Sequence, residues 1–158
     1  MMKMVNEAKE GFRSRNIDQW QKGEPNEQGL TEAIKKDLVH VLEESNEVLA
    51  MVTVVAGPEA DYAVIDGAWL NDEPYFAFHR VCVSEAHKGK GLAGSIFAYS
   101  EALAKEKGVK NIRIDTHPDN LSMQRALAKK WLYLLRKDHF MLWKRSRRSP
   151  FCLPESFK

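Results

Sequence analysis

The residues best suited to chemistry lie between His79 and Gly94, in the order apolar strand, basic glycine loop, start of a helix. The first N–H groups of a helix lack intrahelical acceptors and carry a partial positive charge, so an anion binds there readily. Gly89 and Gly91 have no Cβ, which lets a diphosphate approach the backbone amides closely. The order predicts a pyrophosphate site formed by Lys88, Gly89, Lys90, Gly91, Leu92, Ala93 and Gly94. The plain alternative is a strand-to-helix turn that contains two glycines.

Two familiar phosphate loops fit this stretch less well. No Gly-Lys-Ser or Gly-Lys-Thr follows a four-residue spacer, which excludes the Walker pattern. Gly89, Gly91 and Gly94 do match the pattern G-x-G-x-x-G. Asp115 follows them at about the separation in sequence at which a dinucleotide fold places its ribose-binding acid. That fold turns almost directly after its strand, whereas here residues 84–88 separate the strand from the loop. A dinucleotide-dependent oxidoreductase stays as a lesser alternative.

The loop Ala86-His87-Lys88-Gly89-Lys90-Gly91 resembles the R/Q-x-x-G-x-G/A loop of the GNAT superfamily of acyl-CoA-dependent N-acetyltransferases. Ala86 departs from the pattern, because Arg or Gln is commonest at its position. A second block supports the resemblance, since residues 111–117 read as the next strand and residues 118–130 as the short helix after it. The resemblance covers about residues 16–130, and its segments 17–21 and 66–69 are similar to those of small bacterial members.

This resemblance implies an α/β (α+β) fold in which helices flank a mixed, mostly antiparallel central sheet. We expect one domain over residues 1–158, with atypical ends. Members usually begin with a strand before the first helix, and this chain begins where that strand should be finished, so the sheet would lack an edge strand. Trp131 and Leu132 stand where Gly-Phe normally ends the motif helix, which makes residues 131–158 an atypical C-terminal segment.

The resemblance also implies a reaction. Acetyl-CoA would be the cosubstrate, and its acetyl group would pass to a primary amine of a small molecule or peptide by direct attack in a ternary complex. Its diphosphate would bind the glycine loop, and its pantetheine arm would pair with the backbone of Val81, Cys82 and Val83. One of these N–H groups would polarise the thioester carbonyl. Asn120 would bond to the pantetheine, or act only as a helix N-cap.

The attacking amine must be unprotonated, so a base is needed near the start of the central strand. The candidates are His79, whose class of side chain titrates near neutrality, and Glu73, because members often use a carboxylate through water. A structural strand histidine and a surface turn are the alternatives. The usual general acid is a Tyr, and counting from Asn120 puts Leu127 at its position. Tyr133 could substitute, while Leu127 and the tail favour the alternative of a non-catalytic acyl-CoA-binding module.

Acceptor binding is expected from the first two helices, their connection and the flanks of the central strand. The candidate residues there are Asp18, Trp20, Trp69 and Tyr75. A tryptophan on a loop can also act as a lid over the core, and Trp20 carries both interpretations. No residue discriminates between a metabolite, an antibiotic and a peptide N-terminus as the acceptor.

The apolar pattern predicts the elements that position these residues. Helices are expected at residues 5–13, 30–39 and 92–107, with Gly108 as the C-cap of the last one. Strands are expected at residues 39–44, 47–56 and 61–68 as an antiparallel meander, followed by the central strand at 76–83. Residues 133–143 could form a hairpin or an edge strand.

Composition sets the remaining expectations. Because no apolar run approaches roughly 20 residues and no signal-peptide core is present, we expect a cytoplasmic protein without a membrane partner. A net charge of +2 does not indicate nucleic-acid binding. Cys82 and Cys152 form no zinc or disulfide pattern, and Cys82 is expected to be buried rather than nucleophilic. Open sheet edges predict a homodimer.

Overall fold

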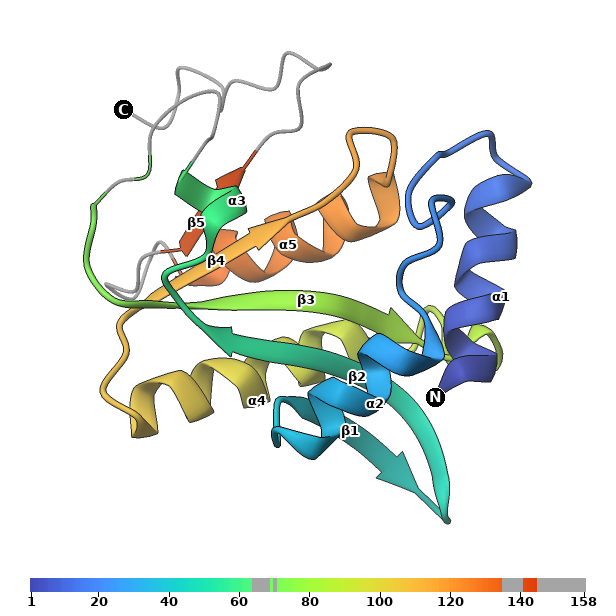
Figure 1. Cartoon of the computed structure of the whole chain (residues 1–158), viewed down its shortest axis with the longest axis horizontal. Helices are drawn as coiled ribbons and strands as arrows, with labels where there is room; N and C mark the ends of the chain where they lie inside the picture. Colours follow the sequence, from blue (N-terminus) through green and yellow to red (C-terminus); the bar gives the residue numbers. More distant parts are fainter. Residues whose placement is uncertain (64–68, 70, 135–140, 145–158) are drawn as a thin grey trace.

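The computed structural model describes residues 1–63, 69, 71–134 and 141–144, and a five-stranded mixed sheet forms the centre of that part of the chain (Figure 1). In spatial order the strands are β1 (Val39–Glu44), β2 (Glu47–Ala56), β3 (Tyr75–Val83), β4 (Asn111–Asp115) and β5 (Met141–Lys144). β1–β2 and β2–β3 are antiparallel over six residue pairs each, while β3–β4 and β4–β5 are parallel over four each. The expected mixed sheet, with antiparallel pairing in the majority, is confirmed.

Helices cover both faces of this sheet (Figure 1). They are α1 (Met2–Arg13), α2 (Glu27–Lys35), α3 (Ala60–Ala63), α4 (Leu92–Glu106) and α5 (Leu121–Leu134), with a 3-10 turn, η1, at Glu85–His87. α4 and α5 pack on one face against β2, β3 and β4. α1 and α2 pack on the other face, against Met51 and Cys82. Among the described residues, no helix combines the length and the apolar character needed to cross a bilayer.

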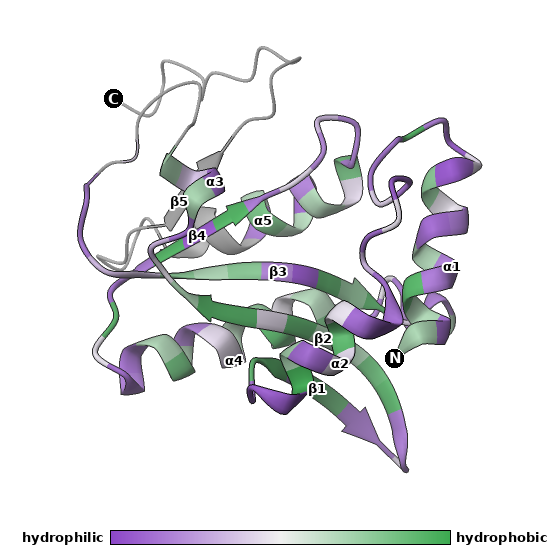
Figure 2. Cartoon of the chain, in the orientation of Figure 1, coloured by the Kyte–Doolittle hydropathy of each residue, from purple (hydrophilic) through white to green (hydrophobic). Residues whose placement is uncertain are grey.

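Strand alternation decides which side chains reach each face. Val52 and Phe78 are 0% and 1% exposed and belong to the core under α4 and α5. Met51 is buried on the face of α1 and α2, so Thr53, two residues further along β2, lies on that face too. Thr53 pairs directly with His79 of β3. His79 therefore lies on the face of α1 and α2, whose connecting loop is mostly hydrophilic (Figure 2).

A β-bulge bends β3 at its middle. The register of β2 against β3 shifts by one residue between Met51 and Thr53, so that Arg80 and Val81 together oppose one residue of β2. Arg80 adopts a left-handed backbone conformation, with φ of +52°. The pairing of β3 with β4 ends at Phe78, and the rest of β3 extends beyond β4 without a partner from that strand.

Local signals explain where several helices begin and end. Asn26 Oδ1 accepts the Gly29 N–H at 2.8 Å at the start of α2. Asn120 Oδ1 accepts the Met123 N–H at 3.2 Å at the start of α5. Gly108 follows α4 with φ of +70°, the left-handed conformation that ends many helices and that glycine favours.

Most of the expected elements are confirmed. The helices expected at 5–13 and 92–107 correspond to α1 and α4, and the strands expected at 39–44, 47–56 and 76–83 correspond to β1, β2 and β3. The C-terminal segment supplies the edge strand β5. Within the described residues, α1 is the first element and no strand precedes it.

The expected bounds of the second helix are wrong. The sequence pattern placed it at residues 30–39, whereas α2 spans Glu27–Lys35. It begins earlier because Asn26 caps its first turn, and it ends earlier because Asp37 has φ of +55°. Val39 then opens β1.

The strand expected at residues 61–68 is also wrong where the structure describes it. Residues 60–63 form the helical turn α3, and residues 64–68 lie outside the described part. In this turn Tyr62 is 3% exposed, with its ring 5.3 Å from that of Trp69 and 6.1 Å from that of Tyr75, measured between centroids. Such tertiary packing outweighs a short alternating pattern.

Gly57→Ala is expected to destabilise the fold, because a Cβ at Gly57 would lie 2.3 Å from the Tyr75 ring. That ring is buried, and its hydroxyl accepts the Glu59 N–H at 2.8 Å. Overpacking lowers the free energy of unfolding by about 1–3 kcal/mol, which chemical denaturation would measure. Gly11→Ala is the control, since nothing lies within 4 Å of its added Cβ; it should gain about 0.5–1 kcal/mol. Wild-type stability in Gly57→Ala would contradict this packing.

Candidate functional site

A cleft of about 1360 Å³ lies beside the unpaired end of β3, between α1, the loop after η1 and the first turns of α4 and α5. Most of the predicted cofactor residues line it: Val81, Cys82, Val83, Lys88, Gly89, Gly91, Leu92, Ala93 and Asn120. Lys90 and Gly94 are not in its lining. The structure thus brings the glycine loop, the strand edge and the α5 cap to one cleft.

The glycine loop presents backbone amides to this cleft. Gly89 and Gly91 have φ of +78° and +81°, which side chains other than glycine rarely adopt. The first intrahelical hydrogen bond of α4 is donated by the Ser95 N–H to the Gly91 carbonyl at 3.2 Å. The N–H groups of residues 92–94 therefore have no acceptor within the helix. The Lys88 N–H already donates to the Glu85 carbonyl at 3.3 Å, so the free amides begin at Gly89. The turn η1 separates β3 from the loop, unlike the tight turn of a dinucleotide fold.

The end of β3 offers a second set of backbone groups. The Ser84 N–H donates to the Leu49 carbonyl at 2.9 Å, so Ser84 and Cys82 direct their main-chain groups to β2. Because these groups alternate along a strand, those of Val81 and Val83 point the other way, into the cleft. β4 does not reach this part of β3. An extended ligand arm could therefore pair here as a further strand would.

Cys82 lines the cleft, and its side chain is buried, as the sequence predicted. The residue is 5% exposed, and its Sγ–H donates to the Met4 carbonyl at 3.5 Å. Burial raises the pKa of the Cys82 thiol to about 12, so it stays protonated at neutral pH.

A second cavity, of about 360 Å³, adjoins the cleft. Both are lined by Phe12, Trp20, Val81, Asn120 and Met123, which form their junction. The charged and hydroxyl-bearing residues of the second cavity are Glu24, Thr53, Glu59, His79, Arg80 and Asp115. Its chemistry therefore differs from that of the cleft, where the glycine loop dominates.

His79 is the central polar side chain of the second cavity. Its Nε2 lies 2.7 Å from Glu59 Oε2, and its Nδ1 lies 3.9 Å from Asp115 Oδ1. An ionised Glu59 can only accept, so Nε2 carries the hydrogen and a neutral His79 ring keeps its lone pair on Nδ1. The ring lies beside that of Tyr62, with centroids 5.7 Å apart. The arrangement suits a base whose orientation is fixed by a carboxylate.

Tyr62 supports this arrangement from α3. Its hydroxyl donates to Asp115 Oδ1 at 2.6 Å. Burial, with the nearby Asp115 carboxylate, raises the pKa of Tyr62 far above its ordinary value. The phenol therefore stays protonated and remains a donor to Asp115.

Four of the predicted catalytic and acceptor residues line neither cavity: Glu73, Trp69, Tyr75 and Asp18. Glu73, exposed in the turn before β3, lines neither cavity, and its N–H donates to Asn71 Oδ1 at 3.1 Å. Trp69 and Tyr75 enclose the Arg113 guanidinium at 4.3 Å and 3.8 Å from their ring centroids. Trp69 and Tyr75 also line neither cavity, and both rings pack against that of Tyr62 in α3.

The position of the expected general acid is apolar and internal. Leu127 is 1% exposed and packs in the core between α5 and the sheet. Tyr133 lies in the last turn of α5, and its side chain is outside the described part of the structure. The described lining of the two cavities therefore contains no tyrosine from α5.

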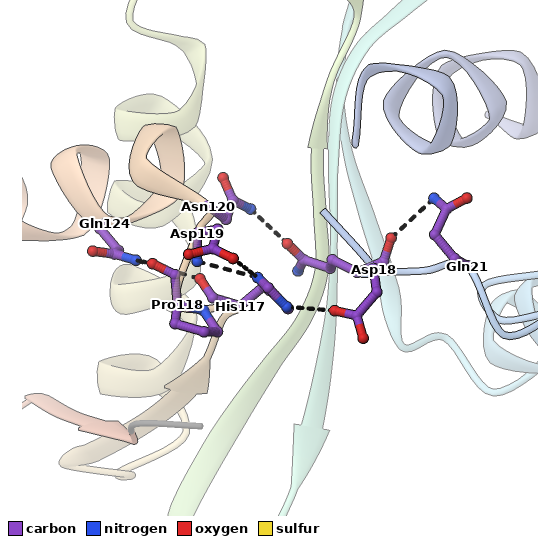
Figure 3. Close-up of polar contacts among 8 residues, drawn as sticks. Asp18, Gln21, His117, Pro118, Asp119, Asn120 and Gln124 are labelled. Carbon is purple, nitrogen blue, oxygen red and sulfur yellow. Dashed lines mark hydrogen bonds and ion pairs between the residues drawn. The ribbon is translucent and has the colours of Figure 1, made fainter. Parts of the chain in front are cut away.

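Two polar contacts join the α1–α2 connection to the loop before α5 (Figure 3). Asp18 Oδ1 lies 2.5 Å from His117 Nε2, and Asn120 Nδ2 donates to Gln19 Oε1 at 2.8 Å. Trp20, which follows Gln19, has φ of +63° and lines both cavities. Asp18 lines neither cavity, but its contact holds the segment that places Trp20 at the junction.

Sequence reasoning missed several residues of the second cavity. Glu59 and Tyr62 reach His79 only because the chain turns back after β2, which no local pattern predicts. Thr53 had a signal, since it is the single polar residue in the apolar run of residues 48–56. A lone hydroxyl within such a run indicates either a hydrogen bond or a cavity.

Comparison with known proteins agrees with this geometry. The chain matches the model of the "Acetyltransferase (GNAT) family" over residues 3–131. It is similar to the structure of a GNAT family acetyltransferase from Streptococcus agalactiae 2603, with 32% identity, 82% of this chain and 75% of that chain covered, and a TM-score of 0.71. It is also similar to the structure of a Staphylococcus aureus MU50 protein assigned as an acetyltransferase, with 29% identity, 81% of this chain and 79% of that chain covered, and a TM-score of 0.65.

A more distant structure shares the fold alone. AAC(6')-Iy, solved with the bisubstrate analog CoA-S-monomethyl-acetylneamine, is 15% identical over 85% of this chain and 84% of that chain, with a TM-score of 0.57. No curated protein matches the chain.

Cys82 should resist thiol reagents in the native protein. With a pKa of about 12, roughly one thiol in 10⁴ is ionised at pH 8, against about one in four for an ordinary cysteine. In a Cys152→Ser background, reaction with 5,5′-dithiobis(2-nitrobenzoate) should be at least about 100-fold slower in the native than in the denatured protein. Equal rates would show that the thiol is ionised or exposed.

Proposed function

Because the chain belongs to the acetyltransferase (GNAT) family, we propose that it transfers an acetyl group from acetyl-CoA to a primary amine by direct attack in a ternary complex. Membership of the family supports acyl-CoA-dependent acetyl transfer in general. The observation that carries the amine acceptor is the junction of two cavities, one with an anion-binding loop and the other with an oriented histidine.

The cleft fits the chemistry of acetyl-CoA. Its loop offers the amides of Gly89 and of the first turn of α4 to a diphosphate. The main-chain groups of Val81 and Val83 suit the amide-bearing pantetheine arm. The CoA analog bound to AAC(6')-Iy supports a CoA ligand for this fold.

His79 is the proposed base. An alkyl ammonium has a pKa near roughly 10.4, so a proton must leave before the nitrogen can attack. Nδ1 of His79 accepts this proton, and Glu59 stabilises the imidazolium through Nε2 at 2.7 Å. Glu73, which lines neither cavity, is the weaker candidate. Glu59 is then a positioning residue for His79.

The transfer itself needs little further assistance. The neutral nitrogen forms a bond to the thioester carbonyl carbon, the carbon–sulfur bond breaks, and CoA leaves as a thiolate. The nitrogen loses its second proton to give the amide, and this proton balances the one that the thiolate takes up to become CoA thiol. The Val81 N–H at the junction would stabilise the developing oxyanion. A thiolate is a tolerable leaving group, so the apolar Leu127 does not exclude turnover, and proximity supplies much of the acceleration.

Leu127 favours one alternative, a module that binds acyl-CoA without turnover. Leu127 is buried in the core, and its side chain cannot donate a proton from the position where members usually have the acidic Tyr. Release of CoA thiol from acetyl-CoA in the presence of an amine would support acetyl transfer, and binding of acetyl-CoA without such release would support the binding module. The single domain, the cytoplasmic location and the homodimer stay proposals from the sequence.

Gly89→Glu should abolish acetyl-CoA binding, because it adds a negative charge and a side chain at φ of +78° in the proposed diphosphate site. The expected loss of affinity in calorimetric titration is about 100-fold or more. Gly108→Glu is the matched control, since its φ is +70°, nothing lies near its added Cβ, and it lines neither cavity. Equal affinity in both variants would argue against the glycine loop.

His79→Gln should lower kcat by about 10²- to 10⁴-fold without changing the affinity for acetyl-CoA. Glutamine can keep a hydrogen bond to Glu59 but cannot take up the amine proton. The control is His40→Gln, because His40 lies on β1 beside Tyr99 and lines neither cavity. A kcat for His79→Gln near that of the control would assign the base elsewhere.

A further inference from the structure

The second cavity has an excess of negative charge. Its described lining contains the carboxylates of Glu24, Glu59 and Asp115 and one guanidinium, that of Arg80. With His79 neutral, these groups sum to two negative charges. A cavity of this kind attracts cations and repels carboxylates.

A second observation, independent of charge, indicates that this cavity binds a ligand. Thr53 is 2% exposed, and its Oγ1 has no hydrogen-bond partner in the described structure. It lines the same cavity and pairs directly with His79 across β2 and β3, so the two side chains are neighbours on one face. Buried hydroxyls are normally hydrogen-bonded, so an unpaired one beside a cavity indicates a partner that enters from outside the chain.

The three carboxylates differ in what they already contact. Glu59 lies at 2.7 Å from His79, and Asp115 accepts the Tyr62 hydroxyl at 2.6 Å, so both lie at the His79 end of the cavity. Glu24 accepts only from neutral groups of Asn26, at 2.6 and 3.2 Å. No ion pair of Glu24 is present among the described residues, but Arg80 is a near neighbour, since Glu24 Oε2 and Arg80 Nη2 lie 3.3 and 3.6 Å from the position that a Cβ on Gly29 would take. A ligand cation would therefore share Glu24 with Arg80.

From these observations we infer that the acceptor is a diamine, or an amine carrying a second cationic group, and that this cavity binds both cationic groups. The inference rests on the proposed acetyl transfer and names its substrate class. The reacting nitrogen lies between Thr53 Oγ1 and His79, where the hydroxyl accepts one of its hydrogens. The second cation lies against Glu24. An amine whose other end is a carboxylate is rejected by the same charge.

The test uses three amines of one chain length that differ only at the far end: 1,4-diaminobutane, 1-aminobutane and 4-aminobutanoate. Diaminopropane and diaminohexane cover other spans. CoA release with acetyl-CoA gives kcat/KM, and calorimetric titration of the CoA-loaded protein gives the affinity of each amine. The best diamine should exceed the monoamine by about tenfold or more in both measurements, with the aminobutanoate weakest.

Two variants assign the effect to residues. Glu24→Gln should remove most of the preference for the diamine over the monoamine, whereas Glu27→Gln, which changes an exposed carboxylate that does not line the cavity, should keep that preference. Thr53→Val removes the unpaired hydroxyl at constant shape. It should weaken the binding of every amine several-fold without lowering Tm, because no internal hydrogen bond is lost.

The outcomes separate the inference from the proposed function. If CoA is released equally well with mono- and diamines, the inference is wrong and acetyl transfer stands. If no amine releases CoA, the proposed transfer fails, and the calorimetric preference for the diamine still decides the inference. Thr53→Val with unchanged amine affinity, or Glu24→Gln with an unchanged preference, would overturn it.

Discussion

The bulge at Arg80 is the constraint on which the site depends. One extra residue in β3 bends the strand, and its pairing with β4 stops at Phe78. Because this pairing stops at Phe78, the edge of Val81 and Val83 has no neighbouring strand in the described part of the chain and leaves room for a ligand. Residues of β3 before and after the bulge line different cavities. His79 before it belongs to the second cavity, and Val83 after it belongs to the cleft.

The rest of the fold holds the two sides of this opening in place. α4 begins directly at the glycine loop, and its buried face anchors the loop to the core. On the other side, the turn after β2 brings Glu59 to His79, while the Tyr75 hydroxyl accepts the Glu59 N–H. The contact of Asp18 with His117 holds the α1–α2 connection over the junction (Figure 3). The cleft thus depends mainly on backbone geometry, and the second cavity on side-chain contacts between distant segments.

This difference explains what the sequence could predict. Glycine spacing, the apolar strand and the Asn120 cap are local features, and most of the predicted cofactor residues do line the cleft. The second cavity was predicted less well, because Glu59 and Tyr62 come close to His79 only when the chain folds back through α3. Trp69 and Tyr75 were singled out as aromatic residues beside the central strand, yet both pack on Arg113 instead. Side-chain type alone could not separate a ligand platform from a core contact.

The most direct test of the central claim is a crystal structure of the protein with CoA. The account predicts diphosphate oxygens within hydrogen-bond distance of the amides from Gly89 to Ala93, and a pantetheine arm along Val81 and Val83 that ends beside His79. A CoA molecule bound elsewhere, with the end of β3 left unpaired, would contradict it.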